Sequence, residues 1–301
     1  MKTVTQTLEL SKRYPARTLV SVIAEAGFEG ADLSMTALGE KLFPLSHSDM
    51  HNYVRDISLA FKDAGIPLLQ SHAPYKWSSY SLEFHERVIL PATVQCIEIA
   101  SALEIPLCVV HPIHNLPFEE QNPHVLFEQN LEFYGRLLHL TRHTGVSIAV
   151  ENMWKKNKVT GVIEDDVCAR PEEFTRYIDA LGSARICACL DIGHLGLCKK
   201  DPESAVLTLG SRIKCIHLHD NDLCTDLHTL PYSGLIDLEG TARALARSGY
   251  AGNITLEADK YLEGAEDGKE LQKRLLALCR SAEKFRERIN YHRRSTSGER
   301  K

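Results

Sequence analysis

Residues 213–222 read IKCIHLHDND, and this short stretch decides how the rest of the chain is interpreted. Its first half is an apolar run too short for a helix and too uniformly apolar for a strand with one face in water. Such a run is typical of a strand that is buried on both faces of a parallel sheet. Its downstream end carries His217, His219, Asp220 and Asp222, so this buried strand is expected to deliver titratable side chains at its carboxyl end.

Further runs of the same kind follow one another along the chain. They are short segments rich in Val, Ile, Leu or Cys, and they span 65–75, 105–114, 145–153, 184–194 and 252–260. Two weaker strands are expected near 4–7 and 30–35, and segments with helical spacing lie between the strands. Eight alternating β and α units predict a single (β/α)8 TIM barrel. The rival doubly wound sheet lacks its glycine-rich GxGxxG marker after the first strand.

Length and composition agree with one large α/β domain. The chain has 301 residues, of which 44% are hydrophobic and 25% charged. We expect the barrel to occupy residues 1–285, and we interpret the basic segment 286–301 as a solvated, frayed end of the last helix. Nine cysteines without a CxxC pair indicate reduced core thiols. With no signal peptide and no apolar run of membrane-spanning length, these thiols predict a cytoplasmic protein.

Most of the expected strands end in residue types that bind metals. These are His72, His111, Glu151, Asp191, His217 and Glu257. In a barrel the carboxyl ends of all strands meet at one mouth, so these side chains should converge. A lone strand histidine is more often a core residue and a lone carboxylate more often a helix cap. Three buried carboxylates at one mouth, however, would repel one another without a cation, so together they predict a divalent metal.

The resemblance to a known family depends on six motifs that occur in a fixed order, namely HAPY, VVHP, VENM, CLDIGH, IHLHDND and LEAD. They resemble the xylose isomerase-like superfamily of TIM barrels over roughly residues 20–260. That superfamily contains sugar isomerases, sugar epimerases and type IV apurinic endonucleases. The resemblance implies that His194 touches substrate and that a metal is held by Glu151, Asp191, His217 and Glu257. Such a hard, mixed ligand set suits manganese, magnesium, cobalt or zinc.

The same resemblance implies an isomerase or epimerase of a small sugar or polyol derivative. Glu151 and Glu257 would move a carbon-bound proton next to a carbonyl, through a metal-stabilised enediolate. The ketose 3-epimerases carry a substrate-binding glutamate and an arginine where this chain has Asn157 and Leu223. These two departures disfavour a free ketohexose epimerase and leave another isomerase, an epimerase or a dehydratase of the superfamily open.

A second hypothesis is a type IV-like apurinic endonuclease with a multinuclear zinc site. Candidates for all nine of its ligand positions are present, the additional ones being His72, His111, His194, Asp226 and His228. These five either hold a second metal or bind substrate hydroxyl groups. The sequence HPIHN, which replaces the endonuclease-like HPGS, and the lack of a basic cluster in the loops favour sugar chemistry. A metal-stabilised binding protein without catalysis is the least favoured interpretation.

Three aromatic residues near the expected mouth are candidates for the substrate pocket. Tyr75, Trp77 and Trp154 either stack against a sugar ring or cover the loops. The expected partner is a small sugar or polyol, with no nucleic acid and no membrane, and a homo-oligomer is compatible with the sequence. The net charge of −5 agrees weakly with the exclusion of nucleic acid.

Overall fold

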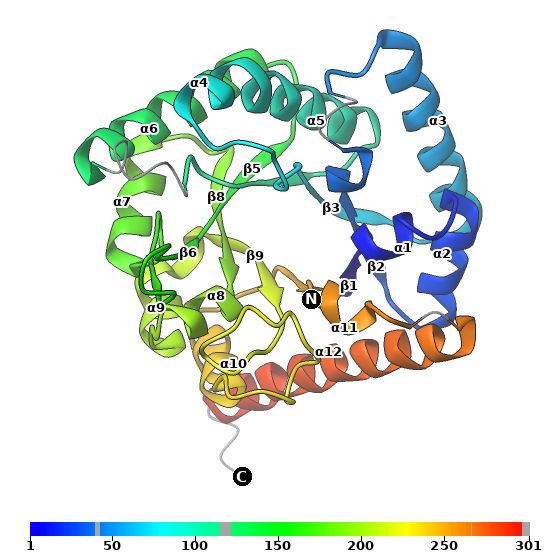
Figure 1. Cartoon of the computed structure of the whole chain (residues 1–301). Helices are drawn as coiled ribbons and strands as arrows, with labels where there is room; N and C mark the ends of the chain where they lie inside the picture. Colours follow the sequence, from blue (N-terminus) through cyan, green and yellow to red (C-terminus); the bar gives the residue numbers. More distant parts are fainter. Residues whose placement is uncertain (40–42, 115–121, 266, 297–301) are drawn as a thin grey trace.

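The computed structural model describes residues 1–39, 43–114, 122–265 and 267–296. Eight parallel strands close into a barrel in the order β1-β10-β9-β8-β5-β4-β3-β2, and helices surround it (Figure 1). The predicted single (β/α)8 barrel is therefore confirmed. Its strands are β1 (Thr3–Gln6), β2 (Gly30–Ser34), β3 (Leu68–His72), β4 (Leu107–Val110), β5 (Ser147–Glu151), β8 (Ile186–Asp191), β9 (Ile213–Leu218) and β10 (Asn253–Leu256).

Strands β4, β5, β8 and β9 form where the sequence offers short, largely apolar runs, because a barrel strand is covered on both faces. Every residue of β1, β2, β4 and β8 is buried. The parallel register pairs His217 of β9 with Asp191 of β8 on one side and with Thr255 of β10 on the other. This register is what brings the polar ends of neighbouring strands to one height at the mouth.

Several helices begin or end at recognisable capping residues. Ser46 accepts a hydrogen bond from the Asp49 amide at the start of α3, and Gly65 ends that helix with a positive φ of 68°. The helices are α1 (Leu8–Ser11), α2 (Ala16–Glu25), α3 (His47–Ala64), α4 (Leu82–Phe84), α5 (Leu90–Ala102), α6 (Pro123–Leu140), α7 (Pro171–Leu181), α8 (Ile192–Leu197), α9 (Pro202–Leu209), α10 (Leu238–Arg247), α11 (Asp259–Leu262) and α12 (Gly268–Thr296), with short turns η1 (Met35–Leu38), η3 (His85–Ile89, π-helical) and η5 (Gly210–Arg212).

A small hairpin at the mouth was not predicted from the sequence. Strands β6 (Trp154–Lys156) and β7 (Ile163–Asp165) pair antiparallel directly after β5. The Asn157 side chain folds the turn, since its Oδ1 accepts the backbone N–H groups of Val159 and Thr160 at 2.9 Å each. Three-residue strands give too little periodicity for sequence analysis to detect.

The last helix, α12, runs across the domain boundary expected at residue 285. Phe285 and Ile289 on this helix are buried, and the Arg288 guanidinium pairs with Glu239 of α10 at 2.5 Å. Figure 1 shows α12 lying along one flank of the barrel. Residues 286–296 are thus part of a packed helix, residues 297–301 lie outside the described part, and the frayed tail stays a prediction.

Two further sequence predictions concern the cysteines and the membrane. All nine cysteines are free thiols, as expected, and seven of them are buried. Cys187, Cys189 and Cys215 lie in an apolar cluster with Leu107, Val109 and Ala149. In the described ranges, none of the helices is both long and apolar enough to cross a bilayer.

Candidate metal centre

Four side chains at the carboxyl ends of neighbouring strands form a compact buried group that we call the strand cluster. Its members are Glu151 at the end of β5, Asp191 at the end of β8, His217 near the end of β9 and Glu257 just after β10. One ligand atom from each lies within 4.8 Å of the others. All four are buried, so the side chains that the sequence assigned to one metal are brought together.

Polar neighbours hold the carboxylates of the strand cluster in fixed orientations. Gln6 of β1 donates from Nε2 to Glu257 Oε1 at 2.6 Å, which leaves Oε2 facing His217 Nδ1 at 2.9 Å. Asp191 Oδ1 accepts the His194 amide at 2.6 Å and so also caps α8. The side chain of Asn152 pairs with both backbone groups of Asp191, at 2.8 and 3.0 Å. The cluster is therefore pre-organised by the barrel itself.

The electrostatics of the strand cluster centre on His217. Burial alone would lower the pKa of this imidazole, but Glu257 and Glu151 raise it well above its ordinary value. Burial alone would raise the pKa of each glutamate, yet His217 holds both pKa values below their usual range. Without a bound cation, a protonated His217 thus balances part of the negative charge.

The donor set of the strand cluster fits a divalent metal ion. Three carboxylates and one imidazole converge in a buried space, and like charges this close require a positive counter-charge. Oxygen-rich sites with a single nitrogen suit manganese, magnesium, cobalt or zinc. Bound there, a cation would take over the balancing charge that the protonated His217 otherwise supplies.

Glu151 also faces a second group, the histidine pair of His72 and His111. Glu151 Oε1 lies 3.2 Å from His217 Nδ1, whereas Oε2 lies 3.3 Å from His72 Nε2 and 3.1 Å from His111 Nε2. His72 donates from Nδ1 to the Ala73 carbonyl at 2.7 Å, so Nε2 is the atom presented to Glu151. The two oxygens of one carboxylate thus point to two neighbouring positions, as a bridging ligand would require.

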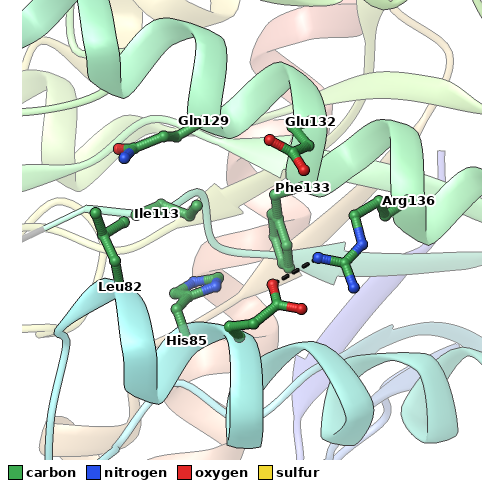
Figure 2. A pocket seen from close by; sticks show the side chains of 8 residues that line it. Leu82, His85, Ile113, Gln129, Glu132, Phe133 and Arg136 are labelled. Carbon is green, nitrogen blue, oxygen red and sulfur yellow. Dashed lines mark hydrogen bonds and ion pairs between the residues drawn. The ribbon is translucent and has the colours of Figure 1, made fainter.

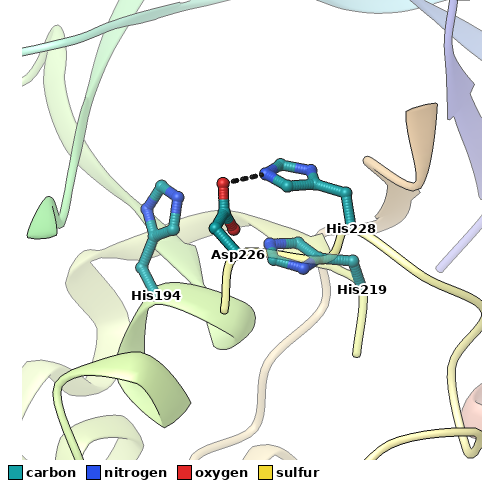
Figure 3. Close-up of side chains that lie close together, drawn as sticks. All are labelled: His194, His219, Asp226 and His228. Atoms are coloured by element: carbon teal, nitrogen blue, oxygen red, sulfur yellow. Dashed lines mark ion pairs between the residues drawn. The ribbon is translucent and has the colours of Figure 1, made fainter. Parts of the chain in front are cut away.

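A third group, the loop cluster, consists of His194, His219, Asp226 and His228 (Figure 3). The His228 ring donates from Nδ1 to the Glu257 carbonyl at 2.6 Å, and its Nε2 lies 3.1 Å from Asp226 Oδ2. Burial alone would lower the pKa of His228, but the hydrogen bond and charge of Asp226 raise it to about 10. Asp226 Oδ1 and His219 Nδ1 are buried and have no hydrogen-bond partner among the described residues. These orphaned atoms leave room for a further ligand or ion.

His219 is a member of the loop cluster that sequence reasoning did not assign. Its ring stacks on His228 with centroids 4.0 Å apart and planes 6° apart, and its Nε2 lies 3.2 Å from Asp191 Oδ1. Gly193 makes this position possible, because a Cβ there would stand 1.8 Å from the imidazole Cε1. The signal was present in the sequence, since residues 217 and 219 are two apart and face the same side of a strand.

The remaining polar residues of the opening stretch are structural. Asp220 is buried and accepts the backbone amides of Asn221, Gly234 and Ile236. Asp222 is exposed and folds a turn by accepting the amides of Cys224 and Thr225. The two histidines of the opening stretch thus belong to the two clusters, whereas its two aspartates fold the loop that follows β9.

Three more buried polar residues behind the strand cluster were not singled out from the sequence. Gln70 of β3 donates to Asp32 Oδ2 at 2.8 Å, and its Nε2 lies 3.1 Å from His217 Nε2. Burial raises the pKa of Asp32 to about 6 despite nearby His72 and His217. Polar residues inside otherwise apolar strands, such as Gln6, Asp32 and Gln70, are the pattern that could have identified them.

The three predicted aromatic residues are used differently. The Tyr75 ring lies 5.2 Å from that of His111 in a stacked arrangement and 5.0 Å from that of His72. Trp154 on the hairpin meets His194 edge to face at 6.4 Å. The Trp77 indole N–H donates to the Pro74 carbonyl at 3.0 Å, and its ring meets that of Phe84 at 6.3 Å. Tyr75 therefore lies beside the histidine pair and Trp154 beside the loop cluster, whereas Trp77 contacts the segment that follows β3.

The two positions that depart from the ketose 3-epimerase pattern have structural roles. Asn157 folds the β6–β7 turn and donates to Glu164 Oε1 at 2.7 Å. Leu223 packs partly buried against the hydrophobic core. In this structure neither position offers a charged group to a substrate at the clusters.

Comparisons with known proteins agree with this architecture. A model of the family described as xylose isomerase-like TIM barrel matches residues 20–280. An uncharacterized protein of Sinorhizobium fredii is 29% identical over 170 residues, which are 55% of this chain and 52% of that protein. The matched part thus spans about half the length of this curated relative.

Solved structures show the same fold at low sequence identity. A D-tagatose 3-epimerase-like protein superposes with a TM-score of 0.73 at 20% identity, covering 98% of this chain and 100% of that chain. A 3-keto-D-glucoside 4-epimerase from E. coli gives a TM-score of 0.70 at 16% identity, covering 93% and 99%. At these identities the similarity concerns the fold alone.

Proposed function

The chain belongs to the xylose isomerase-like TIM barrel family, and from this premise we propose that it is a metal-dependent isomerase or epimerase of a small sugar or polyol derivative. The observation that carries the proposal is the placement of Glu151 and Glu257. Glu151 Oε1 lies 3.2 Å and Glu257 Oε2 lies 2.9 Å from the same atom, His217 Nδ1. Strands β8 and β9 separate β5 from β10, so the two glutamates approach from different sides of one point.

This arrangement supports proton transfer at carbon. A divalent ion bound by the strand cluster would polarise the carbonyl and hydroxyl oxygens of a sugar. Glu151 would remove the carbon-bound proton on one face, and Glu257 would return a proton on the other. Gln6 donates to Glu257 Oε1 and so fixes the orientation of this carboxylate at the strand cluster. The names of the epimerases that share the fold agree with this chemistry.

The substrate would lie against the aromatic side chains at the mouth. Tyr75 beside the histidine pair and Trp154 beside His194 offer two ring surfaces on different sides of the clusters. His111 and His194 would donate or accept hydrogen bonds with substrate hydroxyl groups. Because Asn157 and Leu223 offer no charged side chain here, we favour a modified sugar or polyol over a free ketohexose.

One observation favours a second candidate, an apurinic endonuclease. The nine ligand candidates of that enzyme class fall into three adjacent groups, namely the strand cluster, the histidine pair with Glu151, and the loop cluster. Three metals at such a site would suit phosphodiester cleavage. The two candidates share the site but differ in substrate, so one experiment separates them.

The experiment compares both substrates with the same protein, purified without chelator. A panel of free ketohexoses, keto-glycosides and cyclic keto-polyols is incubated in D2O with manganese or zinc, and carbon-bound deuterium is measured. A duplex with one abasic site is incubated in parallel. We expect deuterium in at least one sugar class and an intact duplex. Chelator-sensitive incision of the duplex without exchange in any sugar would establish the endonuclease instead.

A further inference from the structure

A cavity on the flank of the barrel lies apart from the three clusters. It opens between the segment α4–η3 and helix α6, and it encloses about 250 Å³ (Figure 2). Leu82, Ile113 and Phe133 provide its apolar lining. Ile113 follows His111 by two residues in the segment after β4, so the cavity lies beside the segment that carries one member of the histidine pair. We call it the flank cavity.

His85 is a buried polar group that points into this cavity (Figure 2). Its side chain is only 6% exposed, and its ring meets Phe133 edge to face at 4.6 Å. The imidazole makes no hydrogen bond with any residue in the described ranges. Burial lowers its pKa to about 3, so the ring is neutral and one nitrogen is an acceptor. The ring nitrogens are not fully enclosed by protein atoms, so the acceptor nitrogen is accessible to a ligand or water in the cavity.

Helix α6 contributes two more acceptors. Gln129 Oε1 is buried and has no hydrogen-bond partner among the described residues. Glu132, one turn further along, lines the same cavity and makes no ion pair within the described chain. At the other end, Arg136 pairs with Glu86 at 2.5 Å, so its positive charge is already balanced. The unbalanced charge at the cavity is therefore the negative charge of Glu132. The groups without a partner, Gln129 Oε1 and the acceptor nitrogen of His85, accept hydrogen bonds.

We propose that the flank cavity binds a compact organic cation, an ammonium or amidinium group attached to a planar apolar ring. The N–H groups would donate to Gln129 Oε1, His85 and Glu132, and the ring would lie against Phe133 and Ile113. The volume is below the roughly 300–1,000 Å³ of pockets for drug-sized ligands, which restricts the ligand to one ring. This inference does not depend on the proposed sugar chemistry, because no member of the three clusters lines the cavity.

The test uses benzylamine as the probe, with benzyl alcohol and benzoate as neutral and anionic counterparts. Titration calorimetry and ligand-observed NMR on the full chain should show one benzylamine site. Benzyl alcohol should bind about tenfold more weakly because it lacks the charge, and benzoate should not bind. Adding a chelator should leave benzylamine binding unchanged, which separates this site from the metal centre.

Three substitutions on α6 locate the site. Gln129→Leu should weaken benzylamine binding about tenfold, since a buried acceptor is lost, and Gln129→Glu should strengthen it about threefold. Glu128→Gln is the matched control, because Glu128 is an exposed glutamate of the same helix outside the cavity lining. Equal affinity in all three variants, stronger binding of benzoate, or no benzylamine binding to the wild type would overturn the proposal.

Discussion

The strand cluster and the loop cluster contain the same types of side chain but are held in place by different means. Each ligand of the strand cluster lies at or next to the end of a barrel strand, where the hydrogen-bonded ladder fixes its backbone. Asp226 and His228 of the loop cluster lie in the connection after β9, and His228 adopts a positive φ of 41°. That conformation is unfavourable for a residue with a side chain.

This difference indicates how strongly each cluster should hold a metal. We expect the geometry of the strand cluster to be insensitive to changes in the loops, because four neighbouring strands define it. The loop cluster depends on single contacts, such as the hydrogen bond from His228 Nδ1 to the Glu257 carbonyl and the space above Gly193. We therefore expect one tightly held ion in the strand cluster and a weaker second position that includes the loop cluster or the histidine pair.

The largest effect is expected for metal content. His217→Ala removes a ligand of the strand cluster and should weaken metal binding by more than about 100-fold, since changes to supporting residues alone cost about 10–100-fold. His228→Ala should lower the metal content by one equivalent at most. Elemental analysis of protein purified without chelator measures both, with the exposed His139→Ala as control. Retention of the tightly held ion by His217→Ala, or its loss from His228→Ala, would contradict the ranking of the clusters.

The next effect concerns the packing of the loop cluster. Gly193→Ala should destabilise the protein by about 1–3 kcal/mol, because the new Cβ would displace the His219 ring from its stack on His228. Gly135→Ala, in α6, would place its Cβ more than 4 Å from any neighbouring side chain and should stabilise by up to about 1 kcal/mol. Thermal unfolding of the two metal-free variants compares a crowded helical glycine with an open one. A Gly193→Ala protein as stable as the wild type would show that His219 is not held as described.

The next prediction concerns how the free energy of unfolding changes at alkaline pH. The folded pKa of His228 is about 10, above its unfolded value of about 6.5. Its stabilising contribution is therefore fully present below about pH 6.5 and is lost as the pH rises toward 10. In the metal-free protein, the stability difference between the wild type and His228→Gln should shrink over this window. Chemical denaturation at several pH values measures it, and a constant difference would refute the assignment.

The last effect has the opposite sign and lies outside both clusters. The folded pKa of His85 is lowered to about 3, below its unfolded value, so its contribution is present above about pH 6.5 and is lost as the pH falls. His85→Phe keeps an aromatic ring and removes the titration. We expect the wild type to lose stability relative to this variant between about pH 6.5 and 4. A parallel decline of the two proteins in acid would contradict a buried neutral His85.

The sequence alone predicted that side chains at the strand ends converge, because this signal is local. Each strand is a buried apolar run, and each ligand follows such a run, so the barrel alone brings Glu151, Asp191 and His217 together. The alternation of Cys215, His217 and His219 also predicts one inward-facing row, although His219 was not assigned from it. The ring of His219 packs against Gly193, which lies where β8 passes into α8. This contact joins two distant segments, so no pattern within one segment predicts it.

The elements that sequence analysis missed depend on contacts between distant segments. The hairpin β6–β7 has three-residue strands and a turn that Asn157 folds through its side chain. The segment 286–301 was interpreted as a frayed end of the last helix because it is basic, and this stays a prediction. Phe285 and Ile289 are nevertheless four residues apart, the spacing of a buried helix face, and both are buried.

The central claim is that Glu151 and Glu257 of the strand cluster move a proton at carbon on two faces of a sugar or polyol. The most direct measurement is deuterium incorporation from D2O into the substrate carbon by the wild type, Glu151→Gln and Glu257→Gln, with retained metal measured in each sample. We predict exchange in the wild type and a loss of at least about 100-fold in each metal-loaded variant. Exchange at the wild-type rate in both metal-loaded variants would contradict the account.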